Sequence, residues 1–212
     1  MSEAQLFAMS APAEIAFPPA LFEKRKFNEK AVPRWEIALL FGPDHPDLKP
    51  MKDLCRRIAE SEQAGITKDP KAWKYPWSNA DDFIAKQAAK EDDKKRDNEF
   101  MRGKVLFNSH TAQYEPLLSV NMPERGIVDF RGELRATVKD KFYAGCMVFC
   151  EFSLVWYPPG NGLPGVTAYL NKVCSLNKGE RRGGARSGAE VFGAYIGKLS
   201  ATDPTAGADA DY

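Results

Sequence analysis

The sequence predicts a mainly β fold with α-helical insertions. Thirteen of its 16 glycines lie after residue 125, whereas proline is absent from 77 to 115, an interval that contains the longest charge-dense run. From Gly103 onward, apolar and polar residues alternate with a period of two. Glycine marks turns and proline interrupts helices, so these three observations predict helices in the first half and strands with turns in the second.

In the first half, residues 15–41 predict an opening pair of strands, because apolar residues alternate from Trp35 to Phe41. Prolines then interrupt the chain. An amphipathic helix follows, ending near Gly65, because its apolar residues recur three, four and seven positions apart: Met51, Leu54, Cys55 and Ile58. A second helix is predicted from a Ser78–Asn79 cap to residue 96. The helical insertion is therefore expected around 46–100.

In the second half, four strands are predicted, at 104–112, 117–121, 142–157 and 166–176. A cluster of proline and glycine separates the last two, which are expected to pair as a hairpin. A short helix is predicted over 189–199. We expect residues 1–198 to form one domain and residues 199–212, which have little to bury, to form a flexible acidic tail.

The net charge of +1 conceals an uneven distribution. Residues 1–198 carry 30 basic and 26 acidic side chains, a net charge of +4, and no Lys or Arg follows Lys198. The last 14 residues contain three aspartates. A basic body with an acidic tail excludes a histone-like polycation but allows an anionic partner.

Several classes of protein are not supported by motifs. No stretch is long and apolar enough for a membrane helix, and the N-terminus lacks a secretory signal, so a cytoplasmic protein is expected. The four cysteines lack the paired spacing of zinc sites, and no nucleophile elbow, HExxH or P-loop occurs. We expect no metal, no cofactor and no enzymatic activity. A metal-dependent nuclease built on helical carboxylates (Asp81–Asp82 and Asp92–Asp93) is the remaining enzyme hypothesis.

The predicted hairpin carries the candidate binding site. The even positions of 142–157 are uniformly apolar and are expected in the core, whereas the odd positions mix aromatic and polar residues. Aromatic side chains on a polar sheet face beside a basic glycine-rich loop are typical of proteins that bind single-stranded DNA. The candidates for base stacking are Tyr143, Phe149, Tyr157 and Tyr169. The candidates for phosphate contacts are Lys172, Lys178, Arg181, Arg182 and Arg186.

Two simpler interpretations remain open for these residues. An aromatic side chain on such a face is often covered by a helix or loop, and an arginine in a glycine-rich loop is usually only solvated. The segment Trp73-Lys-Tyr-Pro-Trp77 either adds to the groove or packs the inserted helices.

Three blocks resemble a family of bacteriophage single-stranded DNA-binding proteins. They are Lys141-Phe-Tyr-Ala-Gly-Cys, Gly165-Val-Thr-Ala-Tyr-Leu-Asn-Lys-Val and Asn177-Lys-Gly-Glu-Arg-Arg-Gly-Gly. Family members carry Tyr-Ser-Gly-Cys, Gly-Ile-Ala-x-x-Leu-Asn-x-Val and Asp-Gly-Glu-x-x-Gly-Gly. Weaker matches begin at Phe17, Trp35 and Gly126, so the scattered blocks span about residues 15–197. The Asn177-Lys178 pair departs from the family pattern, which is often acidic there.

The resemblance implies an OB-fold, a five-stranded barrel, with helical insertions, similar in plan to the replication proteins of short-tailed coliphages that bind single-stranded DNA. It also implies roles in DNA replication, recombination and repair. An acidic tail ending in an aromatic residue belongs to the family pattern, and Asp203, Asp209, Asp211 and Tyr212 fit it. Such a tail competes with DNA phosphate for the basic body and, once displaced, engages replication or recombination proteins. A merely solubilising terminus is the alternative.

A second function stays open at this stage: a phage structural or protein-interaction module on a β-barrel without DNA binding. It predicts assembly with itself or with a capsid component, and no binding of single-stranded DNA.

Overall fold

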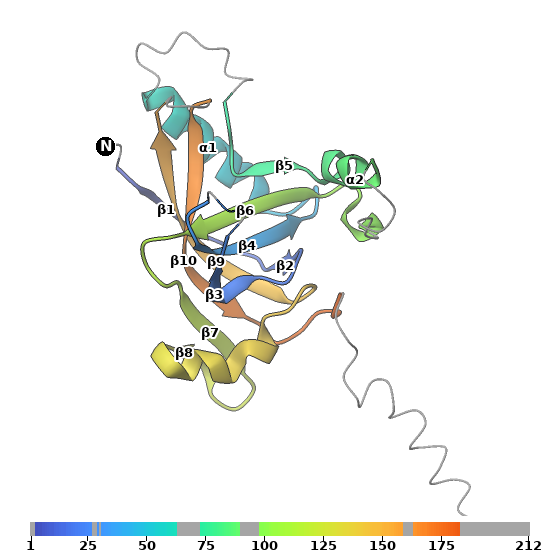
Figure 1. Ribbon diagram of the computed structural model, residues 1–212, viewed down its shortest axis with the longest axis vertical. Helices are drawn as coiled ribbons and strands as arrows, with labels where there is room; N and C mark the ends of the chain where they lie inside the picture. Colours follow the sequence, from blue (N-terminus) through green and yellow to red (C-terminus); the bar gives the residue numbers. More distant parts are fainter. Residues whose placement is uncertain are drawn as a thin grey trace, which may run out of the picture. The chain divides into compact units, whose positions relative to one another are not determined.

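Ten strands form one continuous sheet in the part of the chain that the structure describes (Figure 1). The computed structural model describes residues 3–26, 29, 31–62, 73–89, 98–158 and 163–182. The strands are β1 (Gln5–Ala8), β2 (Ala13–Ile15), β3 (Ala20–Arg25), β4 (Arg34–Phe41), β5 (Trp77–Asn79), β6 (Val105–Thr111), β7 (Leu117–Met122), β8 (Gly126–Phe130), β9 (Met147–Tyr157) and β10 (Gly165–Ser175).

Five of these strands close into a barrel in the order β2, β4, β6, β10, β9 and back to β2. Neighbours are antiparallel except β6 and β10, which are parallel where His110 pairs with Tyr169. This order, with one parallel pair between the third and fifth barrel strands, is that of an OB-fold. The predicted mainly β fold with a five-stranded OB barrel is therefore confirmed.

The other strands extend the barrel. β1 pairs with β9, β3 with β4 and β5 with β6, while β7 joins β10 and carries β8. The sequence prediction did not include β1, β5 or β8. β1 and β5 have four and three residues, too few for a clear alternating pattern, and each is a strand because a longer neighbour supplies hydrogen-bonding partners.

The core fills the barrel as the alternation predicts. In β9, every even-numbered residue is buried and every odd-numbered one is half-buried. The largest fully buried side chains include Phe41, Phe107 and Phe152, contributed by β4, β6 and β9, and the Phe107 and Phe152 rings lie 4.9 Å apart. Cys146 and Cys150 are buried as expected, and burial raises the pKa of both thiols, so neither is a ready nucleophile.

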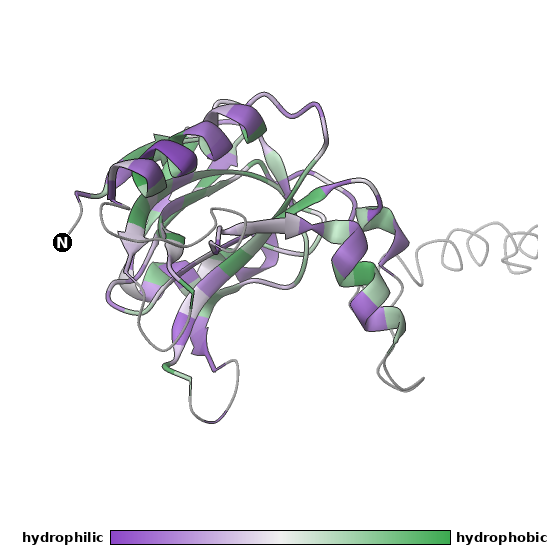
Figure 2. Cartoon of the chain, turned by 90° about the horizontal axis from the view of Figure 1, so that it is seen from above, coloured by the Kyte–Doolittle hydropathy of each residue, from purple (hydrophilic) through white to green (hydrophobic). Residues whose placement is uncertain are grey.

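In the described part of the chain, two α-helices lie between β4 and β6. Helix α1 (Leu48–Glu62) buries Met51, Cys55 and Ile58, and Figure 2 shows its hydrophilic side turned outward. Helix α2 (Ala80–Ala88) begins at the predicted cap, where the Asn79 side chain accepts a hydrogen bond from the backbone N–H of Asp81 at 2.9 Å. The other helices among the residues that the structure describes are the 3-10 segments η3 (Glu99–Met101) and η4 (Gly132–Lys141). No helix was expected over η4.

The strand predicted at 142–157 begins later, at Met147. The chain turns at Gly145, whose φ is +94°, because residues 179–182 pass directly against it. A Cβ at Gly145 would lie 1.7 Å from the carbonyl oxygen of Glu180, and one at Gly179 would lie 2.0 Å from that of Gly145. The two motif blocks that contain these glycines therefore pack against each other with no space for side chains.

The face pattern expected for the last strand changes at a bulge. The pairing of β10 with β9 shifts register between Leu170 and Lys172. Because each one-residue shift exchanges the two faces, Val173 and Ser175 are buried, whereas Lys172 is exposed. Strict alternation along the predicted strand 166–176 would place Val173 and Ser175 on the same face as Tyr169 and Lys172 on the opposite face, and the bulge reverses both placements.

Some predictions fall on residues that the structure does not describe: the helix at 189–199, Arg186, the Asp92–Asp93 pair and the tail. Among the described residues, no helix is long and apolar enough to cross a membrane.

Candidate nucleic-acid interface

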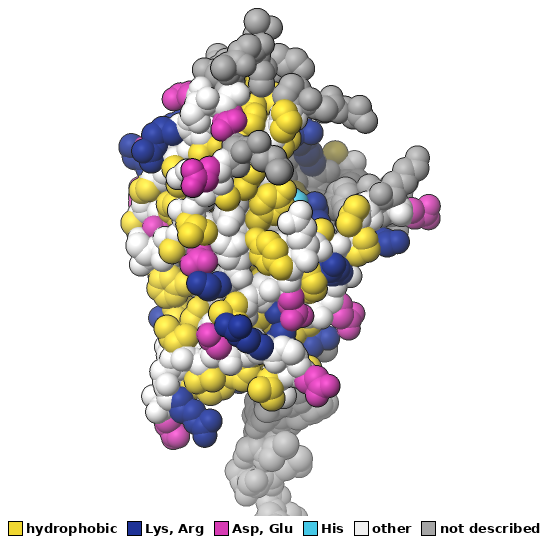
Figure 3. Space-filling model, turned by 90° about the vertical axis from the view of Figure 1, so that its left-hand side faces the viewer, with side chains coloured by type: hydrophobic (Ala, Val, Ile, Leu, Met, Phe, Trp, Pro, Cys, Tyr) yellow, Lys and Arg dark blue, Asp and Glu magenta, His cyan; other side chains and the backbone are white. Residues whose placement is uncertain are grey.

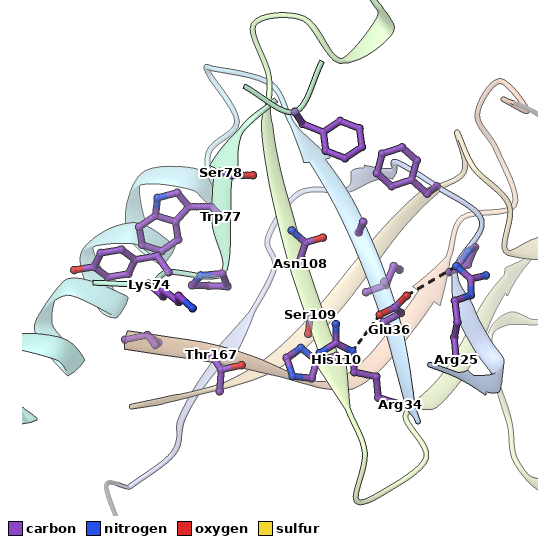
Figure 4. A pocket seen from close by; sticks show the side chains of 18 of the residues that line it. Arg25, Arg34, Glu36, Lys74, Trp77, Ser78, Asn108, Ser109, His110 and Thr167 are labelled. Carbon is purple, nitrogen blue, oxygen red and sulfur yellow. Dashed lines mark hydrogen bonds and ion pairs between the residues drawn. The ribbon is translucent and has the colours of Figure 1, made fainter. Parts of the chain in front are cut away.

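A groove of about 1250 Å³ crosses one side of the barrel. Its floor is formed by β4 and β6, and its walls by the segment before β3, by residues 74–78, by α2 and by the ends of the β9–β10 hairpin (Figure 4). The lining residues are Phe17, Pro18, Pro19, Arg25, Arg34, Glu36, Ile37, Ala38, Lys74, Tyr75, Pro76, Trp77, Ser78, Phe83, Gln87, Asn98, Asn108, Ser109, His110, Tyr157, Val166 and Thr167.

The groove occupies the side of the barrel that OB-folds use for ligands. β4 and β6 are the second and third barrel strands, and the groove is flanked by the connection between the first and second strands and by the ends of the fourth and fifth, β9 and β10. In OB-folds, this strand face and the loops between the first and second and between the fourth and fifth strands bind oligonucleotides and oligosaccharides. The position therefore identifies the groove as the candidate binding site.

Two aromatic pairs line the groove. The Phe17 and Phe83 rings lie 5.3 Å apart at 47°, joining the segment before β3 to α2. Tyr75 and Trp77 are stacked, with ring centroids 4.5 Å apart at 17°. The ammonium of Lys52, on α1, lies 5.8 Å from the Trp77 ring. In Figure 4, the Trp77 side chain lies across the groove from Arg25 and Arg34. Half-buried rings beside a hollow can stack on flat ligands.

The wall that carries Lys74, Tyr75 and Trp77 is held by backbone hydrogen bonds to two barrel strands. The N–H of Lys74 donates to Pro164 at 2.9 Å and its carbonyl accepts from Val166 at 2.9 Å, while Asn108 donates to the Pro76 carbonyl at 2.7 Å. A Cβ at Gly165 would lie 1.9 Å from the Lys74 carbonyl oxygen, so only glycine permits this approach.

Both interpretations of the segment 73–77 therefore hold, for different residues. Trp73 is buried and meets Trp156 edge-to-face at 5.6 Å, which anchors the segment. Lys74, Tyr75 and Trp77 line the groove.

The charged side chains of the lining are mostly basic. Among the described lining residues, Arg25, Arg34 and Lys74 are cations and Glu36 is the single carboxylate. His110 lies opposite Glu36 in the β4–β6 ladder, and burial together with the nearby Arg34 lowers its pKa. His110 is therefore neutral at pH 7, and the lining carries a net charge of +2. Such a groove attracts a polyanion.

Of the four aromatic residues predicted to stack, two lie at the groove. Tyr157 lines it, and Tyr169 meets the ring of His110 edge-to-face at 6.1 Å. Tyr143 is outside the lining; the guanidinium of Arg181 lies 4.2 Å from its ring centroid and its hydroxyl donates to the Gly179 carbonyl at 3.1 Å. Phe149 is also outside it, on the outer face of β9, where it pairs with Cys174.

The structure places the four described residues among the predicted phosphate contacts away from the groove lining, and Arg186 lies outside the described residues. Lys172 forms an ion pair with Glu151 at 3.1 Å, and Arg182 forms one with Glu14. Arg181 donates to the backbone carbonyl of Asp140 at 3.2 Å, and Lys178 is exposed. Figure 3 shows a side of the molecule on which basic, acidic and apolar side chains are interspersed.

Sequence reasoning missed most of the groove. Arg34, Glu36 and Ala38 alternate with core residues along β4, but an alternation of this kind is also what any solvent face shows. One signal was present: aromatic and basic residues occur together in the segment 73–77 and around Phe17–Arg25. The barrel brings these two segments to the same side.

Among the described residues, no group of three His, Cys, Asp or Glu side chains could hold a metal ion. The groove offers aromatic faces, guanidinium and ammonium groups, and the polar side chains of Ser78, Asn108 and Thr167. These groups can bind and orient an anionic, aromatic ligand.

No protein-family model matches this chain, and no curated protein matches it significantly. Among solved structures, it is similar to the single-stranded DNA-binding protein from bacteriophage Enc34 in complex with single-stranded DNA. The identity is 17%, covering 82% of this chain and 87% of that one, with a TM-score of 0.56. A C-terminal truncation of the Enc34 protein matches with 17% identity, 81% and 86% coverage and a TM-score of 0.59. The chain therefore has the fold of this phage protein, as the resemblance of its motifs implies.

Proposed function

We propose that this chain binds single-stranded DNA without regard to sequence and without catalysis, in the groove over β4 and β6. One observation carries the proposal: two aromatic pairs and three cations line a groove on the side of the barrel where OB-folds bind oligonucleotides. The similarity in fold to the Enc34 protein supports it.

The groups in the groove account for the expected mode of binding. Bases stack on Trp77, Tyr75, Phe17 and Phe83, and each stacked base contributes about 1–3 kcal/mol. Every base has an aromatic face, so stacking tolerates any sequence. Arg25, Arg34 and Lys74 bind the phosphates, which makes affinity depend on salt.

A tryptophan in the groove gives a direct test. Titration with oligo-dT, followed by tryptophan fluorescence at two salt concentrations, is expected to show quenching that weakens as salt rises. Trp77→Phe keeps a stacking ring but removes the reporter, so it should lose much of the quenching while keeping most of the affinity. Lys172→Ala, on the outer face, is the control. No binding at low salt would contradict the proposal, and Mg²⁺-dependent cleavage of the oligonucleotide would contradict the absence of catalysis.

We infer further that the protein acts in phage DNA replication, recombination and repair, and that residues 1–198 form the binding domain with 199–212 as an acidic tail. The motif resemblance and the charge distribution support these inferences. Asp203, Asp209 and Asp211 then compete with DNA phosphate, and Tyr212 helps recruit replication or recombination proteins.

The role of the tail has a separate test. A chain that ends at Lys198 is expected to bind oligo-dT more tightly than the full chain at low salt, with the difference disappearing at high salt because screening weakens the competition. Equal affinities at low salt would show that the tail does not compete.

A further inference from the structure

Glu36 lies in the floor of the groove between two arginines. The Nε of Arg34 donates to its Oε2 at 3.2 Å, and the Nη1 of Arg25 lies 3.9 Å from its Oε1. Figure 4 shows both contacts, with Glu36 between the guanidinium groups of Arg25 and Arg34. The Glu36 side chain is 28% exposed, so its carboxylate is accessible from the groove.

The carboxylate of Glu36 occupies the position that a phosphate would take on these arginines. Carboxylate and phosphate both present oxygen atoms that accept from the N–H groups of a guanidinium. Two of the three cations in the lining are therefore already neutralised in part by the protein itself. Among the described residues, Lys74 is the lining cation that forms no ion pair.

We propose that Glu36 is a built-in competitor of DNA phosphate, which limits the affinity of the groove and sets its salt dependence. This proposal rests on the proposed function and names a regulatory residue within the same site. When the groove is empty, Glu36 holds Arg25 and Arg34 at its floor. A DNA phosphate that binds these arginines must replace the carboxylate and lie close to its charge. Glu36 therefore favours release of the strand.

The effect of removing the charge follows from the composition of the lining. Glu36→Gln keeps the shape of the side chain and an oxygen that accepts from Arg34, but raises the net charge of the lining from +2 to +3. Each additional phosphate contact steepens the dependence of log affinity on log salt by about 0.7–0.9. The variant is expected to bind oligo-dT roughly tenfold more tightly at low salt, with a slope steeper by about one.

A matched control is available on the outer face of the hairpin. Glu151 is 27% exposed and pairs with Lys172 at 3.1 Å, so Glu151→Gln makes the same change in charge at similar exposure but outside the groove. It is expected to bind oligo-dT like the wild-type protein. Thermal unfolding of both variants confirms that each is folded at the temperature of the titration.

The titrations of the three proteins separate the possible failures. Affinity of Glu36→Gln equal to or weaker than wild type, with normal wild-type binding, would overturn this proposal alone and assign Glu36 to positioning the arginines. A gain shared equally by Glu151→Gln would also overturn it, because overall charge would then be the cause. Failure of the wild-type protein to bind at any salt would overturn the proposed function, and this proposal with it. In a protein that also carries Arg25→Ala and Arg34→Ala, Glu36→Gln is expected to increase the affinity for oligo-dT by at most half as much as it does alone.

Discussion

The groove over β4 and β6 and the outer face of the β9–β10 hairpin carry similar side chains but in different arrangements. Both contain aromatic and basic residues. In the groove, Arg25 and Arg34 share one carboxylate, and Tyr75 and Trp77 are among the residues that line the hollow. On the hairpin, Lys172 has its own carboxylate partner, and just before β9 the guanidinium of Arg181 lies over the Tyr143 ring. The candidate site therefore differs from the hairpin face because its cations outnumber its carboxylates and its surface is concave, and not because its composition is different.

The polar contacts of the hairpin face add to this difference. The Asn171 side chain donates to Ser153 at 2.9 Å and accepts from the Tyr114 hydroxyl at 2.7 Å. A face whose polar groups already satisfy one another gains little from a ligand, because each new hydrogen bond replaces an existing one.

The largest expected effect comes from the glycine that lets the groove wall approach the barrel. Gly165→Ala places a Cβ 1.9 Å from the Lys74 carbonyl oxygen, so the wall must move; we expect a loss of roughly 1–3 kcal/mol in unfolding free energy and weaker oligo-dT binding. Gly42→Ala is the control, because a Cβ there meets nothing within 4 Å. Denaturant unfolding and oligo-dT titration of both variants measure the effects. Unchanged stability of Gly165→Ala would show that the wall is not fixed.

Removal of a groove ring is the next most severe change. Trp77→Ala is expected to cost about 1–3 kcal/mol in oligo-dT binding, a loss of roughly 5- to 150-fold in affinity, since one base loses its stacking partner. Phe149→Ala, on the hairpin face, is expected to leave binding nearly unchanged. Fluorescence anisotropy of a labelled oligo-dT measures both variants. Equal losses would place the hairpin face in the site and remove the distinction between the two regions.

The cations of the two regions differ in the salt dependence they support. Arg34→Ala is expected to reduce the slope of log affinity against log salt by about one, because one phosphate contact and its released counterion are lost. Lys172→Ala should leave the slope unchanged, since this ammonium is paired with Glu151 outside the groove. The slopes come from titrations at several salt concentrations. A reduced slope only in Lys172→Ala would reverse the assignment.

The smallest effect concerns pH. The pKa of His110 is lowered in the folded protein by burial and by Arg34, so the unfolded chain binds the proton more readily. Stability is therefore expected to fall as pH drops below about 6.5, and to be unaffected by this group at higher pH. His110→Gln should remove this part of the pH dependence. The free energy of unfolding at pH 7.5 and at about pH 5.5 measures it, and an identical pH dependence in the variant would contradict the expectation.

How far the sequence predicts this molecule depends on the length of each element. Alternation of apolar and polar residues predicts the long strands β4, β6, β7, β9 and β10. The helical spacing of apolar residues predicts α1. The Asn79 cap was also predicted. The short strands β1 and β5 carry no pattern of their own. The bulge in β10 escaped prediction, because pairing with β9 determines it, and it moved Lys172 to the other face.

The candidate site was predicted only in part. The site was predicted on the long hairpin because its alternating pattern is the clearest in the sequence. Of the four aromatic residues predicted there to stack on bases, Tyr157 lines the groove. Arg34 and Glu36 alternate with core residues in β4, so the sequence shows them only as a solvent-facing edge of a strand.

The sequence by itself determined the mainly β fold and the inward face of β9, because these follow from local spacing and from side-chain size. The tertiary structure decided where the groove lies. Closure of the barrel brings Arg25, Trp77 and Phe83, from three segments far apart in the chain, around the strand face of β4 and β6. No local sequence pattern predicts this arrangement, because each segment alone is an ordinary exposed edge. The groove exists only when all three segments are folded around the barrel.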